Sequence, residues 1–131
     1  MTPVIEGYFQ VLREDLAAAH HLIAGVPRAS AFHLQQAAEK LVKAVLSIED
    51  IHVGANHDIG QLVGRLPDGH DWKADLAELD YLSRFATAFR YPSPSGRVSP
   101  APDRATLERY ETLIQTLADD AEAWGHSRAA R

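Results

Sequence analysis

The chain has 131 residues, a length that allows one domain with one hydrophobic core. Hydrophobic residues make up 46% and charged residues 24% of it, as in an ordinary globular domain, and no apolar run approaches the ~18 residues that a membrane span needs. The formal net charge of −5 excludes general nucleic-acid binding through bulk electrostatics. The absence of cysteine excludes disulfides and thiolate metal sites. Together with the lack of an apolar leader, it leads us to expect a cytoplasmic protein.

The first predicted helix runs from about Ile5 to Ala24. Its apolar residues recur at three- and four-residue steps, which is typical of one buried helix face; they are Tyr8, Leu12, Leu16, Ala19 and Ile23. Residues 25–27, Gly-Val-Pro, should end this helix, because glycine suits the left-handed position after a helix and proline cannot continue one. A connection this short favours an antiparallel second helix.

The second predicted helix, residues 30–48, is the strongest helical pattern in the chain. It is rich in Ala, Leu, Gln, Glu and Lys and contains no Gly or Pro. We expect Ser30 to cap its start and Glu39 to pair with Lys43 one turn later. Its apolar face carries Leu34, Ala37, Ala38, Leu41, Ala44, Val45 and Ile48.

A polar stripe lies on the other face of this second helix. It consists of His33, Gln36, Lys40 and Lys43. Such a stripe is usually the solvated side of a bundle helix. The alternative is a donor-rich groove that faces a phosphate, a nucleotide or a partner chain.

Two shorter patterns follow a loop at residues 49–56. Asn56 or Asp58 can cap a short third helix. A fourth helix is expected over residues 72–89, with Asp71 as its cap. The polar residues around the loop match no metal-binding motif, so no metal site is predicted.

Residues 91–102 form a Pro-rich segment that reads as neither helix nor strand. Four of its twelve residues are proline, and a loop of that length in a small domain is usually functional or disordered. The planar fork of an arginine grips phosphate or carboxylate at two points. Five arginines gather around this segment, which makes an anion contact one interpretation and favourable charge at a helix end another; they are Arg84, Arg90, Arg97, Arg104 and Arg109.

The last predicted helix begins after a cap at Asp103 and ends at Gly125, and residues 126–131 should form a frayed tail. Together these elements predict an all-α fold, an up-and-down helical bundle of about five helices in a single domain whose core spans about residues 5–125. The last helix has apolar residues around much of its girth. We therefore expect the fourth and last helices to form a dimer interface.

Three segments together resemble a known family. Residues 31–44, Ala-Phe-His-Leu-Gln-Gln-Ala-Ala-Glu-Lys-Leu-Val-Lys-Ala, resemble the second helix of HEPN domains (higher eukaryotes and prokaryotes nucleotide-binding). Residues 57–62, His-Asp-Ile-Gly-Gln-Leu, look like the family's histidine followed by a short helix. Residues 89–92, Phe-Arg-Tyr-Pro, resemble the Arg-Tyr-Pro that closes a later helix in one branch of the family.

The resemblance implies a bundle of about five helices that dimerises, in a prokaryotic protein often encoded beside a minimal nucleotidyltransferase, including toxin–antitoxin pairs. Many members of the family cut RNA with an Arg and a His four to six residues later, late in the bundle. This chain departs from that pattern, because residues 91–97 after Arg90 contain no histidine. The resemblance therefore favours a binding subunit over an enzyme.

The leading hypothesis is a HEPN-like binding module that binds a nucleotide, a partner nucleotidyltransferase, or both. One alternative is a metal-independent RNA-cleaving toxin that uses His33 with Arg90, and another is a purely structural dimerisation protein. No catalytic residue, metal or cofactor is predicted. The predicted ligand-binding residues are Arg90, Tyr91, His33, Gln36, Lys40, Arg84 and Arg97.

Overall fold

The computed structural model describes residues 1–88 and 91–129, and within those residues every regular element is helical. The expected all-α class is therefore confirmed. The elements are α1 (Pro3–Leu22), α2 (Pro27–Ile48), α3 (Ile59–Gly64), α4 (Lys73–Glu78), the 3₁₀ segment η1 (Leu79–Arg84), α5 (Phe85–Ala88) and α6 (Arg104–Ala129).

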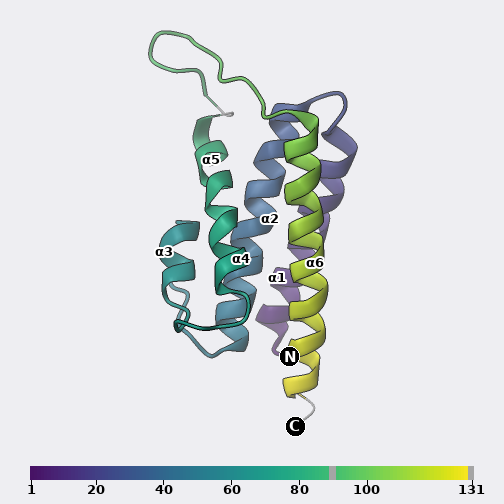
Figure 1. Ribbon diagram of the computed structural model, residues 1–131, viewed down its shortest axis with the longest axis vertical. Helices are drawn as coiled ribbons and strands as arrows, with labels where there is room; N and C mark the ends of the chain where they lie inside the picture. The colour runs from purple at the N-terminus through teal and green to yellow at the C-terminus, as the bar shows by residue number, and fades with distance from the viewer. Residues whose placement is uncertain (89–90, 130–131) are drawn as a thin grey trace.

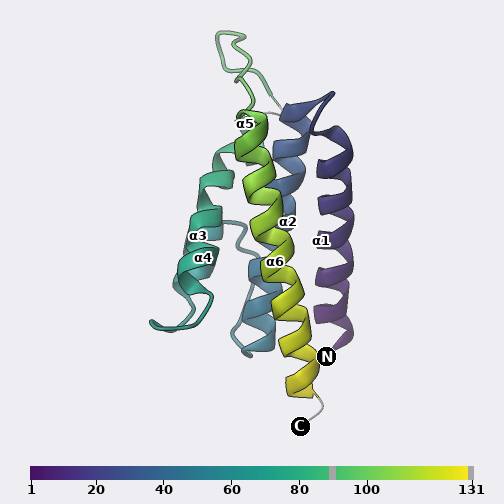
Figure 2. The ribbon, with the colours of Figure 1, turned by 45° about the vertical axis from the view of Figure 1, so that its right-hand side comes forward.

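Helix α2 is the centre of the bundle. It packs along α1 over most of its length and also touches α6, α3, η1 and α5. Figures 1 and 2 show α1, α2 and α6 as long neighbouring rods, with α3 and the α4–η1–α5 rod on one side and the 91–102 loop standing beyond one end. The rods alternate in direction along the chain, as expected for an up-and-down bundle.

The apolar stripes of the sequence meet in one hydrophobic core. Phe9 and Leu12 of α1, Leu41 of α2 and Ile114 of α6 are each at most 1% exposed. Removing one such buried side chain typically costs ~2–5 kcal/mol of stability. No helix in the described part of the chain is long and apolar enough to cross a membrane.

The start of α2 differs from the expectation. The helix begins at Pro27, with Val26 at the cap position and no side-chain cap, because proline is preorganised for the first helical turn. Ser30 is already inside the helix and fully buried. Its hydroxyl donates to the backbone carbonyl oxygen of Ala19 in α1 at 2.8 Å, so its role is to join two helices.

The fourth predicted helix is a composite rod. Asp71 does not cap it; Trp72 occupies the cap position without a side-chain hydrogen bond, and α4 gives way to η1 at Leu79. In a 3₁₀ helix, residues three apart eclipse one another, which places Leu79 and Leu82 on the same buried side. Phe89 and Arg90, the expected end of this helix, lie outside the described residues.

Helix α6 confirms one expected boundary and corrects the other. Asp103 caps its start, since its Oδ1 accepts from the backbone N–H of Thr106 at 2.8 Å. Gly125 does not end the helix, and the residues after it up to Ala129 are helical rather than frayed. Gly125 is buried, and a Cβ there would lie 2.5 Å from Met1 Sδ and 2.9 Å from Ile48 Cδ1, so its smallness permits close packing.

Candidate functional site

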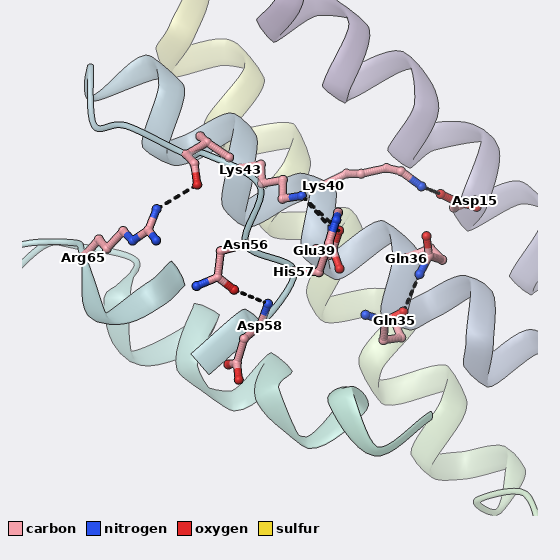
Figure 3. A network of polar contacts seen from close by, with 11 residues as sticks. Asp15, Gln35, Gln36, Glu39, Lys40, Lys43, Asn56, His57, Asp58 and Arg65 are labelled. Carbon is pink, nitrogen blue, oxygen red and sulfur yellow. Dashed lines mark hydrogen bonds and ion pairs between the residues drawn. The ribbon is translucent and has the colours of Figure 1, made fainter. Parts of the chain in front are cut away.

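In the first half of the polar stripe on α2, a carboxylate from α1 contacts two basic side chains. His33 Nδ1 lies 3.0 Å from Asp15 Oδ1, and Lys40 Nζ donates to Asp15 Oδ2 at 2.6 Å. The Asp15 side chain is only 14% exposed. Figure 3 shows Lys40 reaching across from α2 to Asp15. The two basic side chains are thus partly neutralised before any ligand is considered.

A second cluster lies further along α2, at the loop that precedes α3. The atoms Glu39 Oε2, Lys43 Nζ and His57 Nδ1 form a triangle with sides of 2.9–3.1 Å. Glu39 and Lys43 are each 7% exposed, whereas His57 lies at the surface. The expected pairing of Glu39 with Lys43 is confirmed, and Figure 3 shows all three side chains converging.

Gln36 completes the stripe. Its Nε2 donates to the side-chain oxygen of its neighbour Gln35 at 2.6 Å, and Gln35 itself is buried. The donors of the stripe are therefore engaged by acceptors of this chain. A ligand that used them would have to compete with Asp15 and Glu39, so the stripe is a polar seam between α1, α2 and the 49–58 loop.

A different surface opens at the base of the Pro-rich loop. A groove of about 360 Å³ lies between the η1–α5 junction and the end of the loop; it is lined by Tyr81, Arg84, Phe85, Ser99, Pro100, Ala101 and Pro102. Arg84 is exposed, and its guanidinium carbon lies 4.1 Å from the centre of the Tyr81 ring. Its Nε donates to the backbone carbonyl of Tyr81 at 3.1 Å, and its two terminal amino groups form no hydrogen bond with the described residues.

The Tyr81 ring belongs to a ladder that spans two rods. Tyr81 and Tyr110 of α6 stack almost parallel, with ring centres 5.2 Å apart and planes at 5°. The Arg109 guanidinium lies 4.9 Å from the Tyr110 ring centre, so an arginine covers each end of the stack. Among the described residues neither Arg84 nor Arg109 forms an ion pair with a carboxylate.

The loop itself carries two predicted ligand residues. Tyr91 is 67% exposed, and Arg97 is exposed in a tight turn in which Ser93 accepts the backbone N–H groups of Gly96 and Arg97. Gly96 has φ of 81°, a conformation that glycine adopts without strain. Arg90, the residue before Tyr91 in the sequence, lies outside the described residues.

The predicted ligand residues thus fall into two groups. His33, Gln36 and Lys40 share the polar seam, whereas Arg84 lines the groove and Tyr91 and Arg97 lie exposed on the 91–102 loop. Within the described ranges no hydrogen bond or ion pair connects the two groups. No group of three or more potential metal ligands occurs in the part of the chain that the structure describes.

Two residues at these sites escape prediction from the sequence. Asp15 is one polar position on a long amphipathic helix, and nothing in its spacing reveals that it faces His33 and Lys40. Tyr81 occupies a partly buried position in η1. The one available signal was its separation of three residues from Arg84, since i,i+3 neighbours on a helix can touch.

Comparison with known proteins adds a family. A family model described as the HEPN domain matches residues 13–119, which is most of the chain. The match includes both the polar seam and the Tyr81–Tyr110 ladder. No match was found among curated proteins or among solved structures.

Proposed function

The chain belongs to the HEPN domain family, and from that premise we propose that it is a binding module that holds a nucleotide at the groove beside the 91–102 loop. The family supplies the broad class, a nucleotide- or RNA-related module. The particular site rests on this chain's own residues, and the observation that carries it is Arg84.

Arg84 has the properties of an anion-binding side chain that awaits a ligand. It is exposed, it lines the groove, and no carboxylate among the described residues pairs with it. Stacking on Tyr81 fixes the plane of its guanidinium, which reduces the entropy lost when a phosphate binds. A phosphate would therefore meet a preoriented fork with two free amino groups.

The loop supplies the other expected contacts. In this proposal the nucleotide's phosphates lie against Arg84 and Arg97, and its base stacks on Tyr91, because every base offers a flat face to an aromatic ring. Arg90 joins the phosphate contacts by its position between Arg84 and Arg97 in the sequence. His33, Gln36 and Lys40 are given a supporting role, since Asp15 and Gln35 already engage them.

Partners belong to the same proposal. We propose a homodimer that works with a partner nucleotidyltransferase, as a toxin–antitoxin pair in a prokaryotic cytoplasm. The Arg-Tyr-Pro sequence at residues 90–92 is consistent with this proposal. Most large apolar side chains of α6 are buried or pack on the core; they are Leu107, Tyr110, Leu113, Ile114 and Leu117. Among the described residues, the large apolar side chains that are well exposed lie outside α6; they are Val4, Val11, Val26, Tyr91 and Val98.

The test is a thermal-shift titration with ATP, GTP and their monophosphates on the wild type and on Arg84→Gln. A ligand at one hundred times its dissociation constant adds ~2.7 kcal/mol of stability, which moves the unfolding midpoint of a domain this size by several degrees. We expect that shift to be lost in Arg84→Gln.

Arg128→Gln is the matched control. Arg128 also lies over an aromatic ring, 5.0 Å from the Trp124 ring centre, but near the C-terminal end of α6 and far from the groove along that helix. It should keep the full nucleotide shift. Equal shifts of the unfolding midpoint in wild type and Arg84→Gln would exclude the groove as the nucleotide site. The absence of any shift in the wild type would exclude nucleotide binding. RNA cleavage that is abolished by His33→Ala would instead establish the enzymatic alternative.

A further inference from the structure

A second pocket lies at the other end of the bundle and plays no part in the nucleotide proposal. It is a cavity of about 260 Å³ between the end of α2, the turn before α4 and the last turns of α6. Figure 1 shows these segments at the end opposite the 91–102 loop. The lining residues are Glu49, Gly69, His70, Asp71, Trp72 and Trp124.

Three aromatic rings form the walls. Trp72 and Trp124 meet edge to face with ring centres 5.2 Å apart and planes at 87°. His70 lies 5.8 Å from Trp72 and 6.3 Å from Trp124, with its plane at 60° and 83° to theirs. The three rings therefore form a corner whose aromatic walls stand at large angles to one another.

The position of His70 is fixed on both sides of its ring. Its Nδ1 accepts the backbone N–H of Trp72 at 3.2 Å, which assigns the proton to Nε2, and Nε2 lies 3.1 Å from Glu49 Oε2. Only 9% of its side chain is exposed. The histidine therefore holds the turn before α4 against the end of α2 and keeps the corner rigid.

One uncompensated carboxylate borders the corner. Glu49 lies in the wall but is already paired with Arg128 and contacts His70, whereas Asp71 is an exposed carboxylate with no ion pair among the residues that the structure describes. A cation of the chain itself already binds at this corner: Arg128 forms an ion pair with Glu49 and lies over the Trp124 ring, 5.0 Å from its centre. Arg128 is not one of the lining residues, so the side of the corner with Trp72 and Asp71 stays open.

We propose that this pocket binds an alkylammonium head group. Aromatic faces attract cations through their quadrupoles, and tryptophan does so most strongly. A flat guanidinium needs only one ring face, as Arg128 shows on Trp124, whereas a rounded ammonium is surrounded best by rings at large angles. Asp71 supplies the charge that selects a cation over a neutral group of the same shape.

The fluorescence of the protein reports on this site directly. The chain contains two tryptophans, and both line the pocket. The probe is choline, titrated into the intact protein at constant ionic strength, and the neutral control is 3,3-dimethyl-1-butanol, which has the same shape without the charge. We expect a saturable change in tryptophan emission with choline and none with the alcohol.

Two variants keep the test decisive. Asp71→Asn removes the charge but keeps the size and polarity of this exposed side chain. It should weaken choline binding several-fold. Trp124→Leu should weaken it at least ~tenfold, because a desolvated cation–π contact is worth about that factor or more. Thermal unfolding checks that each variant is folded, and Asp71→Asn remains informative if Trp124→Leu is not.

The outcomes separate cleanly. Choline binding that depends on Asp71 supports the site, and a parallel titration with acetyl-trimethyllysine amide shows whether a free head group or a modified side chain binds better. Equal responses to choline and to the alcohol would overturn the proposal, as would a choline titration that is unchanged in Asp71→Asn. No response to any ammonium probe would overturn it too.

Discussion

Ser30 in α2 donates a hydrogen bond of 2.8 Å to the backbone carbonyl oxygen of Ala19 in α1, and both residues are fully buried. The contact lies close to the turn that connects α1 and α2, the two helices that pack most extensively on each other. Small residues at this contact allow the backbones to approach, and the hydroxyl satisfies its own hydrogen-bonding need while doing so. The contact positions α2, which carries the polar seam.

The first prediction concerns this bond. Ser30→Ala should lower the free energy of unfolding by about 1 kcal/mol, the usual net value of one buried hydrogen bond. Ser30→Leu should cost more, because the larger side chain must enter a filled interface. Chemical denaturation measures both, and Ser127→Ala, at an exposed serine of α6, is the control that should change little.

The second prediction concerns the buried pair of Glu39 and Lys43. Removing only the lysine, as in Lys43→Met, leaves a buried carboxylate and should cost ~3–5 kcal/mol. Replacing both, as in Glu39→Met with Lys43→Met, should recover much of that loss, since no unpaired charge remains. Denaturant unfolding of the four proteins in a double-mutant cycle gives the coupling free energy.

His57 provides the contrast for this cycle. It touches both members of the pair, but its side chain is 73% exposed. His57→Ala should therefore change stability much less than Lys43→Met. A His57→Ala variant as unstable as Lys43→Met would mean that the histidine, and not the ion pair, holds the 49–58 loop against α2.

The third prediction compares two helical glycines. A Cβ at Gly7 in α1 would meet nothing within 4 Å, so Gly7→Ala should stabilise the protein by up to ~1 kcal/mol through helix propensity alone. At Gly125 the same gain is opposed, because the side chains of Met1 and Ile48 must move. Gly125→Ala should therefore gain less than Gly7→Ala or lose stability, as thermal unfolding will show.

Much of the fold could be read from the sequence. Periodicity placed α1, α2 and α6, and the cap at Asp103 was correct because capping depends on neighbouring residues alone. The predictions for Ser30 and Gly125 are wrong for one shared reason. Local sequence favours a helix cap at Ser30 and a helix end at Gly125, but each residue instead packs closely against another part of the bundle.

The candidate site is harder to predict from the sequence than the fold. The polar stripe on α2 follows from periodicity, but its neutralisation by Asp15 depends on how α1 is rotated against α2, which no local pattern encodes. The ladder of Tyr81 and Tyr110 joins residues from two separate rods. Arg84 is a candidate from the sequence alone, because charge imbalance is a property of composition and needs no knowledge of packing; its role as a ligand residue stays a prediction.

The fourth prediction concerns the Asp103 cap. A hydrogen bond from the Thr106 side chain, and then one from its backbone N–H, holds the pKa of Asp103 below its usual 3.8. Thr106→Val keeps the shape and the N–H but removes the hydroxyl, so the pKa of Asp103 should rise part of the way toward 3.8. Carboxyl chemical shifts followed by NMR during an acid titration measure this.

The sign of the pH dependence follows from that lowered pKa. A depressed carboxyl pKa stabilises the folded state at pH values above the unfolded pKa, and the contribution is lost as the pH falls through the folded pKa, below 3.8. The stability difference between wild type and Asp103→Ala should therefore shrink on acidification into that range. A difference that is independent of pH would show that the cap acts without its charge.

The fifth prediction separates the roles proposed for the two loop residues, Tyr91 and Arg97. Both are exposed, so Tyr91→Ala and Arg97→Ala should leave the unfolding midpoint without nucleotide nearly unchanged. Tyr91→Ala removes a stacking surface worth ~1–3 kcal/mol per base and should weaken nucleotide binding about tenfold at every salt concentration. Arg97→Ala removes a phosphate contact, so it should weaken binding most at low salt and flatten the dependence of affinity on salt. Calorimetric titrations at several salt concentrations distinguish the two effects, and a salt dependence that is the same in wild type and Arg97→Ala would remove Arg97 from the phosphate site while leaving the case for Arg84 intact.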